Sequence, residues 1–136
     1  MNYKSRNHAK YALTAHLVFT CKYRLPLLAV LGAEIKTLMH TIAAEKDFII
    51  SEMEVDTDHI HLLIDFHPKQ SILHIVRHLK QISTYRIWRQ NGNAALLQQH
   101  LHKERTFWSD GYFVSSVGRL DAAAVEKYIK NQGKKK

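Results

Sequence analysis

The stretch "TDHIHLLIDF", residues 57–66, is rich in apolar residues that alternate with polar ones, a pattern typical of a β-strand. Successive side chains of a strand point to opposite faces, so His59 and His61 would share one face, with their backbones about 7 Å apart. Ile60 and Leu62 would point into the core. A fold that contains this strand therefore presents two imidazoles side by side on the face away from that core.

The segments on either side of this strand have periodicities of their own. Apolar residues recur at helical spacing between Leu31 and Ile42, and Ser71 is a suitable N-cap for a second helix. Residues 94–105 fit either a short helix or a loop, and Gly133 is placed to follow the last helix. The expected elements are strand Tyr11–Cys21, helix Leu27–Lys46, strand Phe48–Val55, strand His59–Phe66, helix Ser71–Gln90, strand Phe107–Gly118 and helix Asp121–Gln132.

This order, β-α-β-β-α-β-α, begins with the ferredoxin-like βαββαβ pattern, an α+β fold in which a four-stranded antiparallel sheet carries helices on one side. The seventh element is an additional C-terminal helix. With 136 residues, of which 46% are hydrophobic, the chain is long enough for one domain with a substantial core. We expect a single domain over residues 1–136, with residues 1–9 and 133–136 as loose tails.

The net charge of +8 and the pI near 9.7 favour a polyanionic partner, because excess positive charge attracts nucleic acid through Coulomb forces and counterion release. The single cysteine, Cys21, excludes an internal disulfide framework and a zinc site built from cysteines. The N-terminal residues lack the uninterrupted apolar segment of a signal peptide, and no run of about 18 apolar residues could span a membrane. We therefore expect a cytoplasmic, nucleoid-associated protein.

The histidine pair is the first candidate for chemistry. Two imidazoles on one strand face can converge on a metal ion, but ten histidines make chance pairs such as His100 and His102 unavoidable. The alternative interpretation is a pair of exposed or partly buried strand histidines without a ligand. Asp58 and Asp65 flank the pair and could orient an imidazole by hydrogen bonding, although ordinary surface roles explain each carboxylate more simply.

The last helix is the second candidate. Tyr128 and Gln132 are four residues apart, so they lie on one helical face about one turn from each other. Val125 and Ile129 form the adjacent apolar stripe. Taken alone, Tyr128 is as well explained by packing of its ring at the edge of the core, so the helix gains a functional meaning only together with the other motifs.

Four motifs, in this order, resemble the IS200/IS605-type transposases, the single-tyrosine (Y1) members of the HUH family. They are "HLVFTCKYRLPLL" from residue 16, "DHIHLLIDF" from residue 58, "FWSDGYFVSSVG" from residue 107 and "VEKYIKNQ" from residue 125. Each motif alone is a weak signal, whereas all four in order at these separations are specific. The resemblance covers roughly residues 10–132, nearly the whole chain.

The resemblance implies an enzyme, a metal-dependent transposase that cuts and rejoins single-stranded DNA at insertion-sequence ends through a 5′-phosphotyrosine intermediate. His59 and His61 would be the metal-binding pair, Gln132 the third ligand and Tyr128 the nucleophile. Mg²⁺ or Mn²⁺ would be the cofactor, and two imidazole ligands suit Mn²⁺ better. The partners would be subterminal DNA hairpins and a second copy of the chain, in a homodimer whose composite active sites join a helix of one subunit to the histidines of the other.

Basic and aromatic residues are the candidates for DNA contacts. Most of the basic ones would be generic phosphate contacts rather than readers of bases. Trp88 and Trp108 could stack on an unpaired base, although core packing is the simpler role. The basic candidates are Lys22, Arg24, Arg77, Lys80, Arg86, Arg89, Lys103, Arg105, Lys127 and Lys130.

Other function classes stay open at this point. A non-catalytic ferredoxin-like module that binds nucleic acid would explain the charge, the sheet and the aromatic residues, but not Tyr128 together with Gln132. A replication initiator or relaxase of the HUH family, or a domesticated relative that kept only hairpin binding, are further alternatives. Metal-dependent covalent attachment to DNA separates the enzymes from the binding module.

Overall fold

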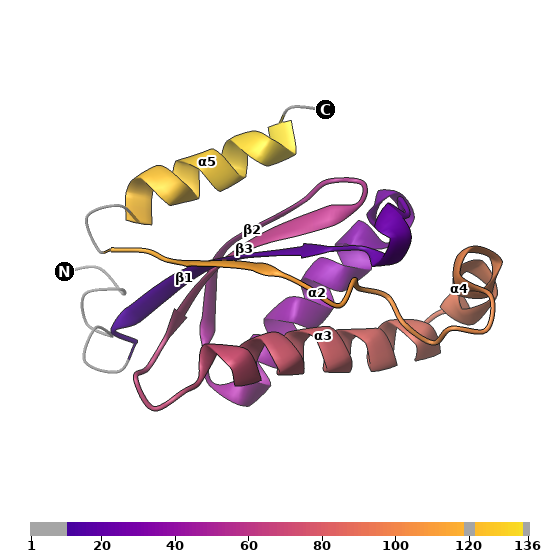
Figure 1. Ribbon diagram of the computed structural model, residues 1–136, viewed down its shortest axis with the longest axis horizontal. Coiled ribbons are helices and arrows are strands. Elements are labelled where there is room, and N and C mark those ends of the chain that lie inside the picture. The colour runs from indigo at the N-terminus through magenta and orange to yellow at the C-terminus, as the bar shows by residue number, and fades with distance from the viewer. Residues whose placement is uncertain (1–10, 119–121, 135–136) are drawn as a thin grey trace.

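The computed structural model describes residues 11–118 and 122–134, which form a four-stranded antiparallel sheet with helices on both faces (Figure 1). The elements are β1 (Leu13–Thr20), the 3-10 turn η1 (Lys22–Arg24), α2 (Leu28–Lys46), β2 (Ile49–Val55), β3 (His59–Phe66), α3 (Ile72–Arg89), α4 (Asn93–Leu101), β4 (Phe113–Ser116) and α5 (Ala122–Lys134). The strand order β2-β3-β1-β4 puts β3 and β1 in the centre. Helices α2 and α3 cover one face and α5 lies over the other. The α+β, ferredoxin-like prediction with an appended helix is confirmed.

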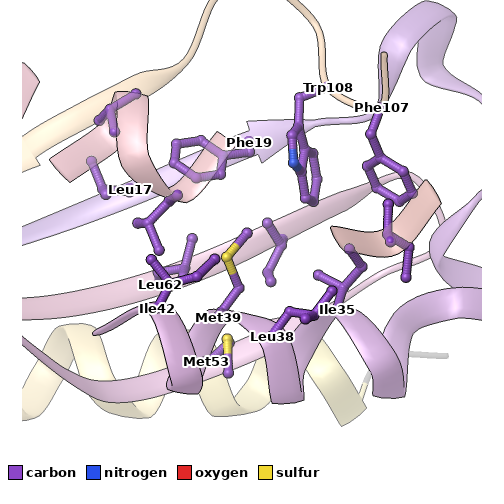
Figure 2. Packing of buried hydrophobic residues seen from close by; sticks show 14 of the residues in the cluster. Leu17, Phe19, Ile35, Leu38, Met39, Ile42, Met53, Leu62, Phe107 and Trp108 are labelled. Atoms are coloured by element: carbon purple, nitrogen blue, oxygen red, sulfur yellow. The ribbon is translucent and has the colours of Figure 1, made fainter. Parts of the chain in front are cut away.

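The main core lies between the sheet and the two helices α2 and α3 (Figure 2). Leu17 and Phe19 of β1 point into it together with Ile60 and Leu62 of β3, and all four side chains are fully buried. Burying such a side chain stabilises the fold by about 1.5–3 kcal/mol. Because these residues occupy one face of each central strand, the residues between them must face α5. The strand predicted at His59–Phe66 is confirmed with the same bounds.

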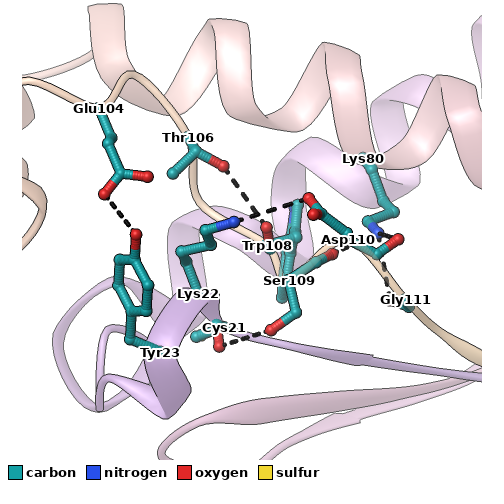
Figure 3. Close-up of polar contacts among 10 residues, drawn as sticks. All are labelled: Cys21, Lys22, Tyr23, Lys80, Glu104, Thr106, Trp108, Ser109, Asp110 and Gly111. Atoms are coloured by element: carbon teal, nitrogen blue, oxygen red, sulfur yellow. Dashed lines mark hydrogen bonds and ion pairs between the residues drawn. The ribbon is translucent and has the colours of Figure 1, made fainter.

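The fourth strand is shorter than predicted: of the range Phe107–Gly118, only β4 is a strand. Phe107 and Trp108 are instead buried core residues, and an isolated β-bridge links Trp108 to the residue that follows β1. Beyond them, Lys80 of α3 donates hydrogen bonds to the carbonyl oxygens of residues 109–111 (Figure 3). A side chain thus satisfies acceptors that a neighbouring strand would otherwise use, and continuous strand pairing with β1 is confined to β4.

Two helices refine the sequence-based expectations. The segment 94–105, for which a helix and a loop were both possible, is helical up to Leu101 as part of α4. Helix α4 follows Gly92, which lies in the left-handed region at φ +72°, and it buries Leu97 and Leu101. Helix α5 continues through Gly133 to Lys134. The predicted helix end at Gln132 and the predicted loose tail are therefore wrong for these two residues. A glycine within a helix lowers its stability by only about 0.5–1 kcal/mol, so Gly133 does not have to end it. Asp121 and residues 1–9 and 135–136 lie outside the described residues. Within the described part, no helix has the length and apolarity needed to cross a membrane.

Candidate active site

The face of the sheet under α5 carries the two strand histidines. His59 and His61 point to this face because Ile60, between them, is fully buried on the core side. Their ring centroids are 5.1 Å apart with the ring planes at 73°. His61 is buried, at 7% exposure, whereas His59 is half-buried. The structure therefore brings the two imidazoles together, as the i, i+2 spacing predicts.

His59 is oriented by the residue that precedes it. Its Nδ1 lies 2.8 Å from Oδ1 of Asp58, and the other carboxylate oxygen of Asp58 accepts a hydrogen bond from Nε of Arg24 at 3.2 Å. The hydrogen bond with His59, with a further contribution from the Arg24 guanidinium, holds the pKa of Asp58 below its usual value. An ionised carboxylate accepts the proton on Nδ1, so Nε2 of His59 keeps its lone pair. The orienting role considered for Asp58 thus has a geometric basis; Asp65 instead accepts a hydrogen bond from Thr14.

His61 is oriented by a residue that sequence reasoning did not select. Nε2 of His16, on β1, lies 3.1 Å from Nδ1 of His61, and the two rings stack with their centroids 5.4 Å apart. Burial lowers the pKa of His61 to about 4, with the nearby His59 and His16 adding to the shift, and burial also lowers the pKa of His16. Both imidazoles are neutral at pH 7. When His61 donates from Nδ1 to His16, its Nε2 is left as a free donor atom for a ligand.

Helix α5 places Tyr128 over this histidine cluster. The tyrosine ring centroid is 6.0 Å from that of His61 and 6.3 Å from that of His16, and both contacts are edge-on. The next residue, Ile129, is fully buried, while the tyrosine itself is 51% exposed and can meet a substrate. Lys130 adds an ion pair to Glu52 of β2 at 3.6 Å. One chain therefore brings its own Tyr128 and histidine pair onto the same face.

Two imidazoles on this face are the available ligands for the divalent cation that the sequence resemblance implies. Among the described residues, no group of three or more His, Cys, Asp or Glu side chains is arranged to hold a metal ion. Nδ1 of His59 and Nδ1 of His61 each lie within hydrogen-bonding distance of a neighbour, the arrangement by which metal-binding histidines are oriented. Gln132 is half-buried one turn beyond Tyr128 on the same helix, where its amide oxygen could complete such a set.

The candidate DNA-binding residues separate into two groups. Several are engaged within the protein: Lys22 pairs with Asp110, Arg24 with Asp58, Arg86 with Glu45, Lys130 with Glu52, and Lys80 holds carbonyl groups. Arg77, Arg89, Lys103, Arg105 and Lys127 are exposed. Trp88 and Trp108 are buried, and their indole N–H groups donate to the carbonyl of Thr106 and to the hydroxyl of Ser83, so core packing is their role.

The fold and this face together define a class of small basic protein, in which a ferredoxin-like sheet presents two histidines to a tyrosine on an appended helix. Residues 9–132 match the sequence model of the family described as "Transposase IS200 like". The chain belongs to this transposase family. Membership points to an enzyme that cleaves and transfers DNA.

Two curated relatives support this assignment. The transposase of insertion sequence element IS200 from Salmonella typhimurium is 31% identical over 132 residues, which cover 95% of this chain and 82% of that protein. The ISDra2 transposase TnpA of Deinococcus radiodurans is 32% identical over 127 residues, covering 90% of this chain and 85% of that protein. The family resemblance drawn from the four sequence motifs is thus confirmed.

Two solved structures share the fold. The crystal structure of a protein from Deinococcus radiodurans R1, described there as a transposase, superposes with a TM-score of 0.69 at 29% identity, over 88% of this chain and 90% of that one. A REP-associated tyrosine transposase bound to a REP hairpin superposes with a TM-score of 0.64 at 14% identity, over 88% of this chain and 65% of that one. The second likeness shows the fold alone.

Proposed function

We propose that this transposase cuts and rejoins single-stranded DNA at the ends of an insertion sequence, with Tyr128 as the nucleophile. The observation that carries the proposal is the position of the half-exposed Tyr128 ring, whose centroid lies 6.0 Å from that of His61 on the face of the sheet under α5. Neither an isolated tyrosine nor an isolated histidine pair would suggest phosphodiester chemistry. Their convergence from two distant parts of the chain, in a member of this family, does.

The proposed step is a transesterification. The Tyr128 oxygen attacks the scissile phosphorus, a bond from that oxygen to phosphorus forms, and the bond from phosphorus to the 3′ oxygen breaks. The phenol proton is lost and the departing oxygen gains one, so the products are a 5′-phosphotyrosine and a free 3′-OH. The ester keeps the energy of the broken bond, and a second 3′-OH can therefore rejoin the strands by the reverse reaction without a nucleotide cofactor.

His59, His61 and Gln132 would hold Mg²⁺ or Mn²⁺ next to the nucleophile. A divalent cation there would neutralise charge that develops on the phosphate oxygens and polarise the phosphorus. The neutral, buried state of His61 supports this role, because only an unprotonated imidazole is a ligand. Asp58 and His16 would orient the two imidazoles, and Ile129 would fix the helix that carries Tyr128.

The DNA partner in this proposal is a single strand with subterminal hairpins, and the working form is a homodimer. The solved REP-associated transposase, a protein of the same fold, is bound to a REP hairpin. Exchange of α5 between two subunits would keep the contacts that this helix makes with the sheet, such as Lys130 with Glu52, and would create composite active sites. Without exchange, each chain would use its own Tyr128.

The test is a covalent-adduct assay. The full chain is mixed with single-stranded DNA from the regions that flank its gene, with Mn²⁺ or Mg²⁺, and run on a denaturing gel. We expect a shifted band that requires the metal and is abolished in Tyr128→Phe. Tyr23→Phe is the matched control, because Tyr23 is exposed and its hydroxyl donates to Glu104, and it should keep the band. DNA binding without any adduct would favour the non-catalytic module or the domesticated relative.

A mixing experiment decides how subunits share the site. Tyr128→Phe chains and His59→Ala chains are each expected to be inactive. If α5 is exchanged, mixed dimers combine one intact tyrosine with one intact histidine pair and recover adduct formation. If each chain uses its own tyrosine, the mixture stays inactive, and the composite-site part of the proposal is wrong.

A further inference from the structure

A basic and aromatic groove runs along α3. Helix α3 lies on the side of the sheet opposite to α5 (Figure 1). It has a volume of about 590 Å³ and lies between α3 and the segment that leads from α4 to β4. Lys80 ties the two walls together through the carbonyl groups of residues 109–111, and the indole of Trp88 bonds to Thr106 (Figure 3 shows the first of these ties). Hydrogen bonds thus hold the walls of the groove in place, and the groove takes no part in the site under α5.

One wall is a row of residues at helical spacing. Arg77, Gln81, Tyr85 and Arg89 are four residues apart in succession and all are exposed, so they form a stripe about 18 Å long on α3. The guanidinium of Arg89 lies 4.1 Å from the ring centre of Tyr85. Tyr85 is 60% exposed, a high value for a large aromatic side chain. A packing role does not explain this stripe.

The other wall has the same chemistry. Arg105 lies over the ring of the buried Trp88 at 4.7 Å, and Tyr112 is 39% exposed at the far end of the groove. Asp110 is the acidic residue of the lining, and Lys22 pairs with it at 3.6 Å. The two walls therefore combine arginines with exposed tyrosine rings, and the charge of the acid is offset.

We propose that this groove is a second DNA-binding surface, which holds an unpaired strand remote from Tyr128. Arginines attract phosphates, and an exposed tyrosine stacks on any base whose face is free. In a duplex those faces are covered by neighbouring base pairs, so the exposed Tyr85 and Tyr112 select single-stranded DNA. The single-strand binding by the groove is inferred from its own residues, whereas the choice of DNA over RNA rests on the proposed function.

Binding is measured in the Tyr128→Phe chain, so that covalent attachment cannot contribute. The probe is a fluorescent oligo(dT) of about 20 nucleotides, titrated at several salt concentrations. Tyr85→Leu removes a stacking ring but keeps apolar bulk, and it should raise Kd about fivefold or more. Arg89→Ala combined with Arg105→Ala should reduce the slope of log K against log salt by about 1.4, which is 0.7 for each lost phosphate contact.

Lys36→Ala is the matched control, since it removes one positive charge from α2, where Lys36 pairs with Glu54. Its Kd should stay within about twofold of the parent value. Unchanged affinity in all groove variants would overturn the proposal, and so would an equal loss in Lys36→Ala, which would make net charge the cause. If the groove variants instead change the oligomeric state without changing DNA affinity, the groove is a subunit interface.

A cross-link provides a test that needs no substitution in the groove. Oligo(dT) that carries bromodeoxyuridine is irradiated with the Tyr128→Phe chain, and the modified peptides are mapped. Adducts at Tyr85 or Tyr112 are expected, and adducts confined to the α5 face would overturn the proposal. These outcomes are independent of the proposed chemistry. If the unsubstituted chain forms no phosphotyrosine adduct, binding of DNA in the groove is unaffected. If it does form the phosphotyrosine adduct, binding in the groove is not thereby established.

Discussion

His16 connects the first strand to the candidate active site, and its role depends on a single hydrogen bond. Its Nε2 is 3.1 Å from Nδ1 of His61, whose ring centroid is 6.0 Å from that of Tyr128. If His16 accepts, His61 has its proton on Nδ1 and Nε2 can bind a cation. If this partner is lost, the ring can rotate and both tautomers become accessible. His16 is thus a positioning residue for the proposed metal site.

We expect His16→Ala to weaken Mn²⁺ binding by about 10- to 100-fold, the usual effect of removing such a partner. His16→Gln keeps an acceptor at this position and should restore part of the affinity. The measurement is calorimetric titration of metal-free protein, which does not depend on activity. His100→Ala is the control, since His100 bonds to its own helix at Leu96, and it should bind Mn²⁺ like the parent. Equal affinity of His16→Ala and the parent would rule out this role.

At the scale of elements, the sequence predicted well the helices and strands that show a clear periodicity. The strand from His59 to Phe66 has the predicted bounds because alternation is visible in its own residues. The strand beginning at Phe107 was predicted too long because aromatic residues buried in a loop resemble those buried in a strand. His16 was missed for a related reason: its contact with His61 requires β1 to pair with β3, and register is not a property of either strand alone.

Lys80 holds the backbone of residues 109–111, which were predicted to belong to the fourth strand. It donates to three successive carbonyl oxygens. Burial lowers its pKa, and the Asp110 carboxylate opposes this shift. We expect Lys80→Met to lower the free energy of unfolding by about 1.5–3 kcal/mol, because hydrogen bonds to a charged group are lost. Urea unfolding checks this value. Lys36→Met, which loses only an exposed ion pair, should cost about 0–1 kcal/mol, and an equal cost for both would contradict the assignment.

At the scale of the whole molecule, the two functions proposed here occupy opposite sides of one sheet. The core between the sheet and α2 and α3 fixes the strands, and the strands fix His59 and His61 on the other side. Burying imidazoles to build that face has a thermodynamic consequence. A histidine that is neutral in the folded protein but free to take a proton in the unfolded chain makes stability depend on pH.

The direction of this dependence follows from the pKa of His61, which is about 4 in the folded protein against 6.5 in the unfolded chain. Above pH 6.5 neither state binds the proton, so stability is at its full value. As the pH falls from 6.5 towards 4, only the unfolded chain gains the proton, and stability is lost. At about pH 5 the loss from this residue is roughly 2 kcal/mol relative to pH 7.5. The lowered pKa of His16 acts in the same direction.

Urea unfolding at the two pH values, with a chelator present, measures the loss directly. His61→Asn removes the titrating group, so its loss of stability on acidification should be smaller than that of the parent by about 2 kcal/mol. His100→Ala, at a histidine outside the cluster, should leave the difference between the two pH values unchanged. If the parent is equally stable at both, or if His61→Asn loses as much as the parent, His61 is not held neutral by the fold. Burial would then not explain why His61 is unprotonated and able to bind a cation at pH 7.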